Sequence, residues 1–114
     1  MTQCLFCKIV AGEIPTHAIF ENAHVLAFND VNPQAPVHAL VIPKKHIDTI
    51  NMLQDDDKML VGEIFLAAKY IATENKIAND GYRVVMNCNR AAGQSVFHIH
   101  LHVMGGRSMS WPPG

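Results

Sequence analysis

Three histidines, His98, His100 and His102, alternate with branched apolar residues near the end of the sequence. Strict alternation is typical of a half-buried strand, in which residues i, i+2 and i+4 share one face. We therefore expect the three imidazoles on one face of a strand, about 6.5–7 Å apart along the chain, with the intervening residues in the core. Imidazole titrates near neutral pH, binds metal ions and can attack phosphorus. The pattern leaves three possibilities open: surface histidines without a function, a metal site, or nucleophilic catalysis at phosphorus.

A turn that can bind phosphate, Gly93-Gln94-Ser95, comes shortly before the histidines. Glycine lets the main chain approach a ligand closely, and consecutive N–H groups can hold phosphate oxygens. The Ser95 hydroxyl adds a donor, and Asn87, at the end of the preceding predicted strand, can bring an amide to the same place. Gly-x-Ser is a common turn, so the motif points to a site only through its position beside the histidine row.

Two of the three cysteines, Cys4 and Cys7, have the spacing of metal ligands. One such pair supplies half of a tetrahedral zinc site, so two further ligands must come from distant positions. The alternative is a pair of reduced thiols in a helix that packs on the sheet. An odd number of cysteines with one close pair is more typical of cytosolic thiols or a metal knuckle than of a disulfide framework. The third cysteine, Cys88, has no evident base beside it, and we assign it no role.

The composition indicates a compact protein with a hydrophobic core. The chain has 114 residues, 49% of them hydrophobic, and we expect residues 1–114 to form one domain. A formal net charge of −1 and a pI of about 6.6 argue against a nucleic acid polymer as partner. No apolar run approaches the roughly 20 residues of a membrane span, and the first residues lack a secretory pattern. We therefore expect a cytoplasmic protein without a membrane partner.

The remaining sequence predicts the elements that position these residues. A short helix is expected over 4–11. One long helix starts at the acidic residues 55–57 and continues to about 75, with an apolar stripe that packs in the core. Sequential strands with one long helix indicate an α+β fold with a largely antiparallel sheet. Strands are expected over 17–21, 24–29, 37–42, where Pro43 ends the strand, 82–86 and 95–104.

The pattern His-φ-His-φ-His-φ-φ, where φ is apolar, resembles the signature of the histidine triad (HIT) family and is complete over 98–104. Residues 5–9, 13–15 and 27–30 resemble the N-terminal half of that family. Residues 33–38, 41–46, 105–107 and 111–114 are similar to its nucleotide-binding, Hint-like branch. The resemblance covers nearly the whole chain. It implies a HIT-like fold with a mainly antiparallel sheet, one long and one short helix, and a homodimer in which the sheet continues between subunits.

The resemblance also implies a purine nucleoside phosphoramidase, which hydrolyses P–N bonds in compounds such as adenosine 5′-phosphoramidate. His100, the middle histidine of the signature, would attack the α-phosphorus and form a nucleotidyl-histidine, which water would then hydrolyse. His98 and His38 would orient and polarise His100, and His102 would contact the phosphate or the leaving group. Catalysis would require no metal ion.

The same resemblance assigns residues to the substrate, a purine nucleotide. The Asp30 carboxylate would accept hydrogen bonds from the ribose hydroxyls. Asn87, Gly93 and Ser95 would bind phosphate oxygens or help to protonate the leaving amine. An apolar slot for the base would be lined by Phe6, Ile9, Phe28, Val31 and Leu40, although ordinary core packing would also explain these residues.

A structural zinc ion is implied as well, because a subset of the family carries the cysteine pair. In that subset the site is completed by the histidine after Pro-Lys-Lys and by the first histidine of the signature. The ligands here would be Cys4, Cys7, His46 and His98. This role competes with the one suggested for His98 beside His100, and the sequence does not decide between them.

The last residues, Trp111-Pro112-Pro113-Gly114, cannot continue regular structure. The resemblance implies that this segment reaches the partner subunit's site and that Trp111 influences leaving-group specificity. The alternative is a tail that docks on its own domain. The same ending argues against a dinucleoside polyphosphate hydrolase or nucleotidyl transferase with the same nucleophile. A non-catalytic nucleotide-binding interaction module and a metal-dependent hydrolase are further alternatives, and intact His38, Asn87, Ser95 and His100 speak against the former.

Overall fold

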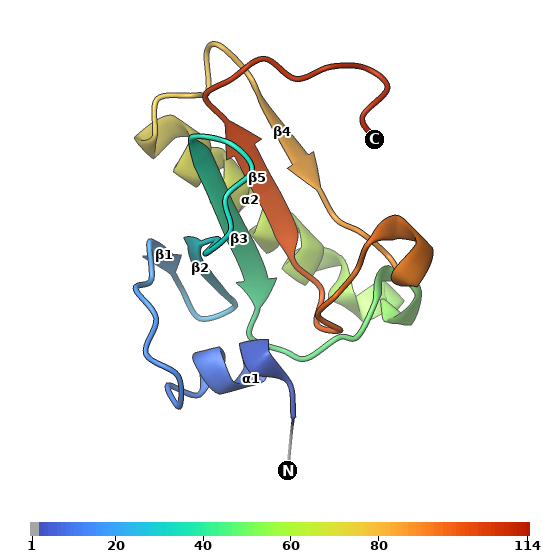
Figure 1. Cartoon of the computed structure of the whole chain (residues 1–114). Helices are drawn as coiled ribbons and strands as arrows, with labels where there is room; N and C mark the ends of the chain where they lie inside the picture. Colours follow the sequence, from blue (N-terminus) through green and yellow to red (C-terminus); the bar gives the residue numbers. More distant parts are fainter. Residues whose placement is uncertain (1–2) are drawn as a thin grey trace.

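One antiparallel sheet organises the molecule. In the computed structural model, which describes residues 3–114, five strands follow the order β1-β2-β3-β5-β4 (Figure 1). Two α-helices, α1 (Leu5–Val10) and α2 (Lys58–Glu74), accompany the sheet. The predicted α+β fold, with one long and one short helix, is confirmed. The strands are β1 (Phe20–Glu21), β2 (Val25–Asn29), β3 (Val37–Pro43), β4 (Tyr82–Val85) and β5 (Leu101–Gly105).

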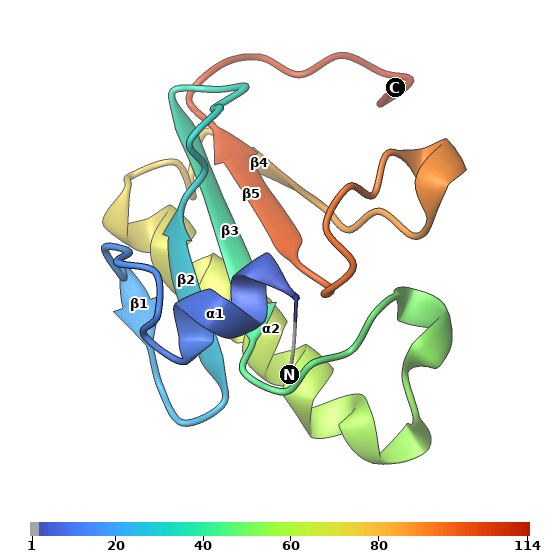
Figure 2. The same ribbon diagram turned by 60° about the horizontal axis from the view of Figure 1, so that its bottom comes forward.

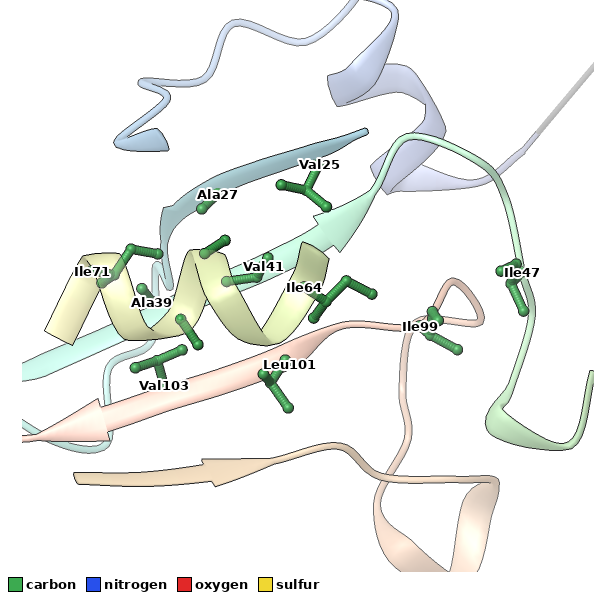
Figure 3. Close-up of a cluster of buried hydrophobic side chains, with 12 residues drawn as sticks. Val25, Ala27, Ala39, Val41, Ile47, Ile64, Ile71, Ile99, Leu101 and Val103 are labelled. Carbon is green, nitrogen blue, oxygen red and sulfur yellow. The ribbon is translucent and has the colours of Figure 1, made fainter. Parts of the chain in front are cut away.

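Helix α2 covers one face of the sheet. The apolar stripe of the helix is buried, as predicted, and Figure 3 shows side chains of the strands pointing toward it. Full burial of one such side chain contributes about 1.5–3 kcal/mol. The core on this face includes Val25, Ala27, Ala39, Val41, Ile47, Ile64, Ala67, Ala68, Ile71, Ile99, Leu101 and Val103.

The short helix α1 lies over the opposite face of the sheet (Figure 2). Phe6 is its buried residue and joins a second apolar cluster with Leu26, Phe28, Leu40 and Ile42. Because side chains alternate along a strand, β2 and β3 contribute residues both to the core under α2 and to the apolar cluster under α1. The two helices therefore cover different faces of the sheet, and nine predicted site residues line a cleft on the α1 face.

The histidine strand is shorter than predicted. β5 begins at Leu101, so His98 and His100 precede the sheet. The N–H of Ile99 donates to the carbonyl of Ile47 at 2.8 Å instead of continuing a strand ladder. The apolar and imidazole side chains still alternate, since Ile99 and Leu101 are in the α2 core while Phe6 of α1 contacts the His98 and His100 rings.

Other predicted boundaries also shift. The strand expected over 17–21 is limited to β1, because residues 14–17 leave the sheet and line a cleft. The strand expected over 82–86 ends at Val85, and Pro43 is the last residue of β3 and not its stop. The acidic residues 55–57 form a 3₁₀ turn before α2, in which Asp57 caps the chain by accepting from the N–H of Gln54 at 2.8 Å.

Three further segments complete the fold. Short 3₁₀ turns occur at Ile50–Met52 and Arg90–Ala92. The C-terminal segment runs past the edge strand β4, where the Arg83 guanidinium donates to the Ser110 carbonyl at 2.9 Å. Within residues 3–114, the helices are too short or too polar to cross a membrane.

Candidate functional site

A cleft of about 560 Å³ opens on the α1 face of the sheet. Its floor and walls come from α1, the ends of β2 and β3, the segment 14–17 and the residues before β5. Nine predicted site residues line it: Phe6, Ile9, Phe28, Asp30, Val31, Leu40, Ser95, His100 and His102. The structure thus brings the apolar residues expected around a base together with two of the three histidines of the row.

His100 is fixed in one orientation and one tautomer. Its Nδ1 lies 2.8 Å from the carbonyl oxygen of His98. A carbonyl can only accept, so Nδ1 carries the proton and Nε2 holds the lone pair. The ring is 8% exposed and meets the edge of the Phe6 ring at a centroid distance of 5.1 Å. Burial lowers the pKa of His100 from its usual value. The side chain is therefore a neutral imidazole with a free Nε2 lone pair, which is the form that acts as a nucleophile.

A second group beside His100, here named the imidazole cluster, consists of Asp30, His38 and His102. The N–H of Gln34 donates to His38 Nδ1 at 2.9 Å, so the proton of neutral His38 is on Nε2. This Nε2 lies 2.9 Å from Nδ1 of His102 and 3.4 Å from the Asp30 carboxylate. His102 accepts through Nδ1 and consequently carries its own proton on Nε2. The cluster is arranged to donate hydrogen bonds.

Burial lowers the pKa of His102 to about 4, and the neighbouring His100 and His38 add to this shift. A neutral His102 beside a neutral His100 avoids two positive charges at ring centroids 5.0 Å apart. His100 and His102 are thus both uncharged at neutral pH. This state suits attack by His100 and hydrogen-bond donation by His102.

His38 lies beside His102 and Asp30, whereas the resemblance implied a role beside His100. His38 contacts His102 and Asp30 and does not hydrogen-bond to His100. His98 contacts Nδ1 of His100 through its main-chain carbonyl and not through its ring. The two roles suggested for His98 are therefore geometrically compatible. The contact with His100 uses the main-chain carbonyl, and the ring can act as a metal ligand.

The His98 ring belongs to what we call the thiol cluster, formed by Cys4, Cys7, His46 and His98. Its four candidate ligand atoms lie within 4.8 Å of one another. Individual separations are 3.3 Å from Cys4 Sγ to His98 Nδ1, 3.1 Å from Cys7 Sγ to His46 Nδ1, and 3.2 Å between the two Nδ1 atoms. Ligands of a tetrahedral zinc ion are about 3.3–3.8 Å apart. These separations lie at or slightly below that range, so the cluster is compact enough to hold a metal ion.

The tautomers of the thiol cluster agree with this fit. Nε2 of the fully buried His98 lies 2.7 Å from the carbonyl of Pro43, so it carries the proton and leaves the Nδ1 lone pair directed at the cysteines. Nε2 of His46 is hydrogen-bonded to the Asp48 carboxylate, which leaves its Nδ1 lone pair directed at the same point. Carbonyl and carboxylate partners of this kind commonly orient histidine ligands of metals.

Three predicted substrate-binding residues lie outside the lining of the cleft. Asn87 follows β4, and Gly93 ends the Arg90–Ala92 turn in a left-handed conformation with φ of 95°. Trp111 is 82% exposed on the C-terminal segment. Neither of the first two is far in sequence from Ser95, but only Ser95 of this loop reaches the cleft.

Sequence reasoning missed several residues of the site. Leu5, Ile14, Pro15 and Asn29 were noted only as part of the resemblance. Thr16, His17 and Val96 stand outside any motif, and no spacing pattern marks them as site residues. Gln94 was also overlooked. It is buried, donates to the carbonyls of Asp48 at 2.8 Å and Val96 at 3.1 Å, and accepts from the N–H of Asn89 at 2.7 Å. All three partners are main-chain groups, so the sequence contains no side-chain pattern from which these hydrogen bonds of Gln94 could be predicted.

Comparison with known proteins identifies relatives that share this fold. It is 47% identical over 110 residues to an uncharacterised HIT-like protein of Synechocystis, covering 96% of each chain. The crystal structure of a HIT family hydrolase from Legionella pneumophila superposes with a TM-score of 0.96 at 54% identity, covering 98% of this chain and 100% of the other. A histidine triad nucleotide-binding protein from Candida albicans gives a TM-score of 0.81 at 32% identity, covering 96% and 83%.

The family model of the HIT domain matches residues 11–109. This range includes both edge strands, β1 and β4, and all three histidines of the row. The chain belongs to the HIT family.

Proposed function

We propose that this protein is a hydrolase that cleaves the P–N bond of purine nucleoside phosphoramidates, such as adenosine 5′-phosphoramidate, through a nucleotidyl-His100 intermediate. The observation that carries the proposal is the 2.8 Å contact between His100 Nδ1 and the His98 carbonyl, which leaves the Nε2 lone pair for attack. The names of two similar proteins, a hydrolase and a nucleotide-binding protein, support the general class.

In the first step His100 Nε2 attacks the α-phosphorus and forms an N–P bond. The bond from phosphorus to the leaving amine breaks, and its electron pair stays on the amine nitrogen, which takes up a proton. The Ser95 hydroxyl, which lines the same cleft, donates to the leaving nitrogen and passes on a proton from water. The Nε2–H of His102 donates to a phosphate oxygen as negative charge develops there.

In the second step a water oxygen attacks the same phosphorus. The P–Nε2 bond breaks, its electron pair returns to His100, and the nucleoside monophosphate leaves while the proton of water is lost to solvent. His38 keeps Nδ1 of His102 occupied at 2.9 Å, so the Nε2–H of His102 remains directed to the phosphate throughout. Asn87 and Gly93 would complete the phosphate-binding loop.

The base and ribose would occupy the wider part of the cleft. Phe6 and Phe28 meet edge to face with ring centroids 5.6 Å apart and supply an aromatic wall. Asp30 retains acceptor capacity beyond its hydrogen bond from the N–H of Asn32 at 2.9 Å, so its carboxylate can receive the ribose diol. Ile9, Val31 and Leu40 extend the apolar surface around the base.

We also propose that the thiol cluster holds a structural zinc ion. Zinc on Cys4, Cys7, His46 and His98 would supply a closed tetrahedral cross-link that joins α1, the segment after β3 and the segment before β5. No catalytic step depends on it in this proposal. Metal analysis of protein purified without chelator tests the site, and a fully folded protein that contains no metal would refute it.

A homodimer with a continuous sheet completes the proposal. β4 pairs with β5 on one side only, and its other edge is available to a second copy. The C-terminal segment is held beside β4 by Arg83 and would carry Trp111 toward the partner's cleft. We take the dimer, formed from one HIT domain per chain, to be a cytoplasmic enzyme without membrane or nucleic acid polymer as partner.

The test is a turnover panel that compares nucleoside phosphoramidates with dinucleoside polyphosphates. We expect efficient hydrolysis of adenosine 5′-phosphoramidate and little hydrolysis of the polyphosphates. The His100→Ala variant should lose phosphoramidase activity while it still binds AMP. Wild-type activity in this variant would show that the mechanism is wrong, and preference for dinucleoside polyphosphates would move the assignment to the other branch. Complete loss of turnover in folded, chelator-treated protein, together with failure to form nucleotidyl-His100, would instead favour a metal-dependent hydrolase.

A further inference from the structure

His98 takes part in two arrangements at once. Its ring completes the thiol cluster, while its main-chain carbonyl accepts the proton of His100 Nδ1. We propose that the thiol cluster positions the nucleophile: metal held by the cluster fixes the His98–Ile99 peptide, and this peptide fixes the tautomer and direction of His100. This inference rests on the proposed role of His100 as the attacking group.

The peptide unit between His98 and Ile99 is held from both ends. Its carbonyl accepts from His100, and its N–H donates to the carbonyl of Ile47 at 2.8 Å. A trans peptide is planar, with C=O and N–H pointing in opposite directions. Any movement of Ile47 therefore rotates the carbonyl that His100 depends on.

The segment 46–48 carries several of the outer connections, in addition to the Pro43 carbonyl that accepts from His98 Nε2. His46 contributes a ligand atom, Ile47 contributes the carbonyl that holds the peptide, and Asp48 contributes two contacts. The Asp48 carboxylate accepts from His46, and its main-chain carbonyl accepts from the buried Gln94 side chain at 2.8 Å. Because Gln94 precedes Ser95, the same short segment supports the nucleophile and the phosphate-binding loop.

A metal ion would lock this arrangement. The Nδ1 lone pairs of His46 and His98 face each other at 3.2 Å, which is favourable only when a positive centre lies between them. Thiol hydrogens are weak donors and give weaker restraint. With the cation removed, the 46–48 segment is free to shift, and the His98–Ile99 peptide shifts with it.

The effect should fall on turnover and not on binding. Besides its contact with the His98 ring, Phe6 packs in the second apolar cluster with Leu26, Phe28, Leu40 and Ile42, none of which is a metal ligand. We therefore expect the base slot to persist when metal is removed. Partners that orient a ligand from outside typically change activity about 10- to 100-fold when lost, and we expect kcat to fall about tenfold with KM changed less than about twofold.

The experiment compares zinc-loaded protein, chelator-stripped protein and protein reloaded with Zn²⁺. Zinc content, kcat, KM for adenosine 5′-phosphoramidate, Kd for AMP, and the ¹⁵N chemical shifts of His100 are measured on each. In the loaded protein His100 should show a single tautomer with the proton on Nδ1. The stripped protein should show a mixture of tautomers and lower kcat, with Kd for AMP retained, and reloading should restore the loaded values.

Matched variants separate this effect from general damage. Cys7→Ser removes one ligand and should reproduce the stripped state, while Cys88→Ser removes a thiol outside the cluster and should behave as wild type. Asp48→Asn keeps all four ligand atoms and provides the test if stripped protein unfolds. In this variant kcat should rise with bound zinc as zinc is titrated in.

Three results would overturn the coupling. The first is a folded, stripped protein with unchanged kcat and a single His100 tautomer. The second is a Cys7→Ser variant with wild-type kcat and a single His100 tautomer. The third is an Asp48→Asn variant whose kcat is independent of bound zinc. The proposed function fails separately, through absence of phosphoramidate turnover in loaded wild type. The tautomer of His100 and the Kd for AMP still decide the coupling in that event.

Discussion

The thiol cluster and the imidazole cluster contain similar side chains and are prepared for opposite tasks. Each is a group of potential metal ligands within 4.8 Å of one another. In the thiol cluster, Pro43 and Asp48 accept the histidine protons on the outside, so lone pairs face inward. In the imidazole cluster, the N–H of Gln34 occupies His38 Nδ1 from the outside, so a proton faces inward. The neighbours of a histidine, more than its presence, determine whether it binds a cation or an anion.

Metal binding is the strongest test of this difference. Cys4→Ser should lower zinc affinity by more than about 100-fold, above the range for residues that only orient a ligand. His38→Asn should leave one zinc ion per chain, since His38 is outside the thiol cluster. Elemental analysis and competition with a chromogenic chelator measure both. A zinc ion lost with His38 and kept without Cys4 would reverse the comparison.

Turnover tests the imidazole cluster in the same way. His102→Ala removes the Nε2–H donor and should lower kcat about 100-fold, the lower range for a group that assists proton transfer or charge development. Zinc content should remain that of wild type. Single-turnover kinetics, which follow formation of the nucleotidyl-enzyme, give the measurement. An unchanged rate of intermediate formation would remove His102 from the first step.

The two clusters were not equally visible in the sequence. The Cys4-x-x-Cys7 spacing and the alternating histidines predicted both places, and the family resemblance supplied His46 and His38. Apart from the Asp48 carboxylate, the deciding partners are main-chain groups: the carbonyls of Pro43 and His98 and the N–H of Gln34. Any residue type can provide such groups, so the direction of each imidazole could not be predicted. The late start of β5 has the same origin, since Ile99 donates to Ile47 outside the sheet.

The response of stability to pH offers a further test of the imidazole cluster. The pKa of His102 is lowered to about 4 by burial first, and by His100 and His38, while Asp30 opposes the shift. The unfolded chain, with a pKa near 6.5 for this residue, binds the proton more readily. Stability should therefore fall as pH decreases from about 6.5 toward 4.

Denaturant unfolding at pH 7.5 and pH 5 measures this loss. The difference between the two pH values should be smaller in His102→Gln, because glutamine does not titrate. NMR titration of His102 should place its midpoint well below that of an ordinary histidine. A midpoint near 6.5 would show that His102 is not held neutral by its surroundings.

Asp30 gives the smallest expected effect and the sharpest distinction, because it borders both the substrate cleft and His38. Asp30→Asn keeps one acceptor oxygen for the ribose and loses the charge, a change of about 1 kcal/mol or roughly fivefold in KM. If Asp30 acts only on the ribose, kcat should remain unchanged. If it also holds the proton of His38 in place, kcat should fall together with affinity, and the ribose-free phosphoramidate of a simple alcohol should be affected as well. A fall in kcat with the ribose-free substrate would therefore contradict a role limited to the ribose. It would show that Asp30 also acts on catalysis through its contact with His38.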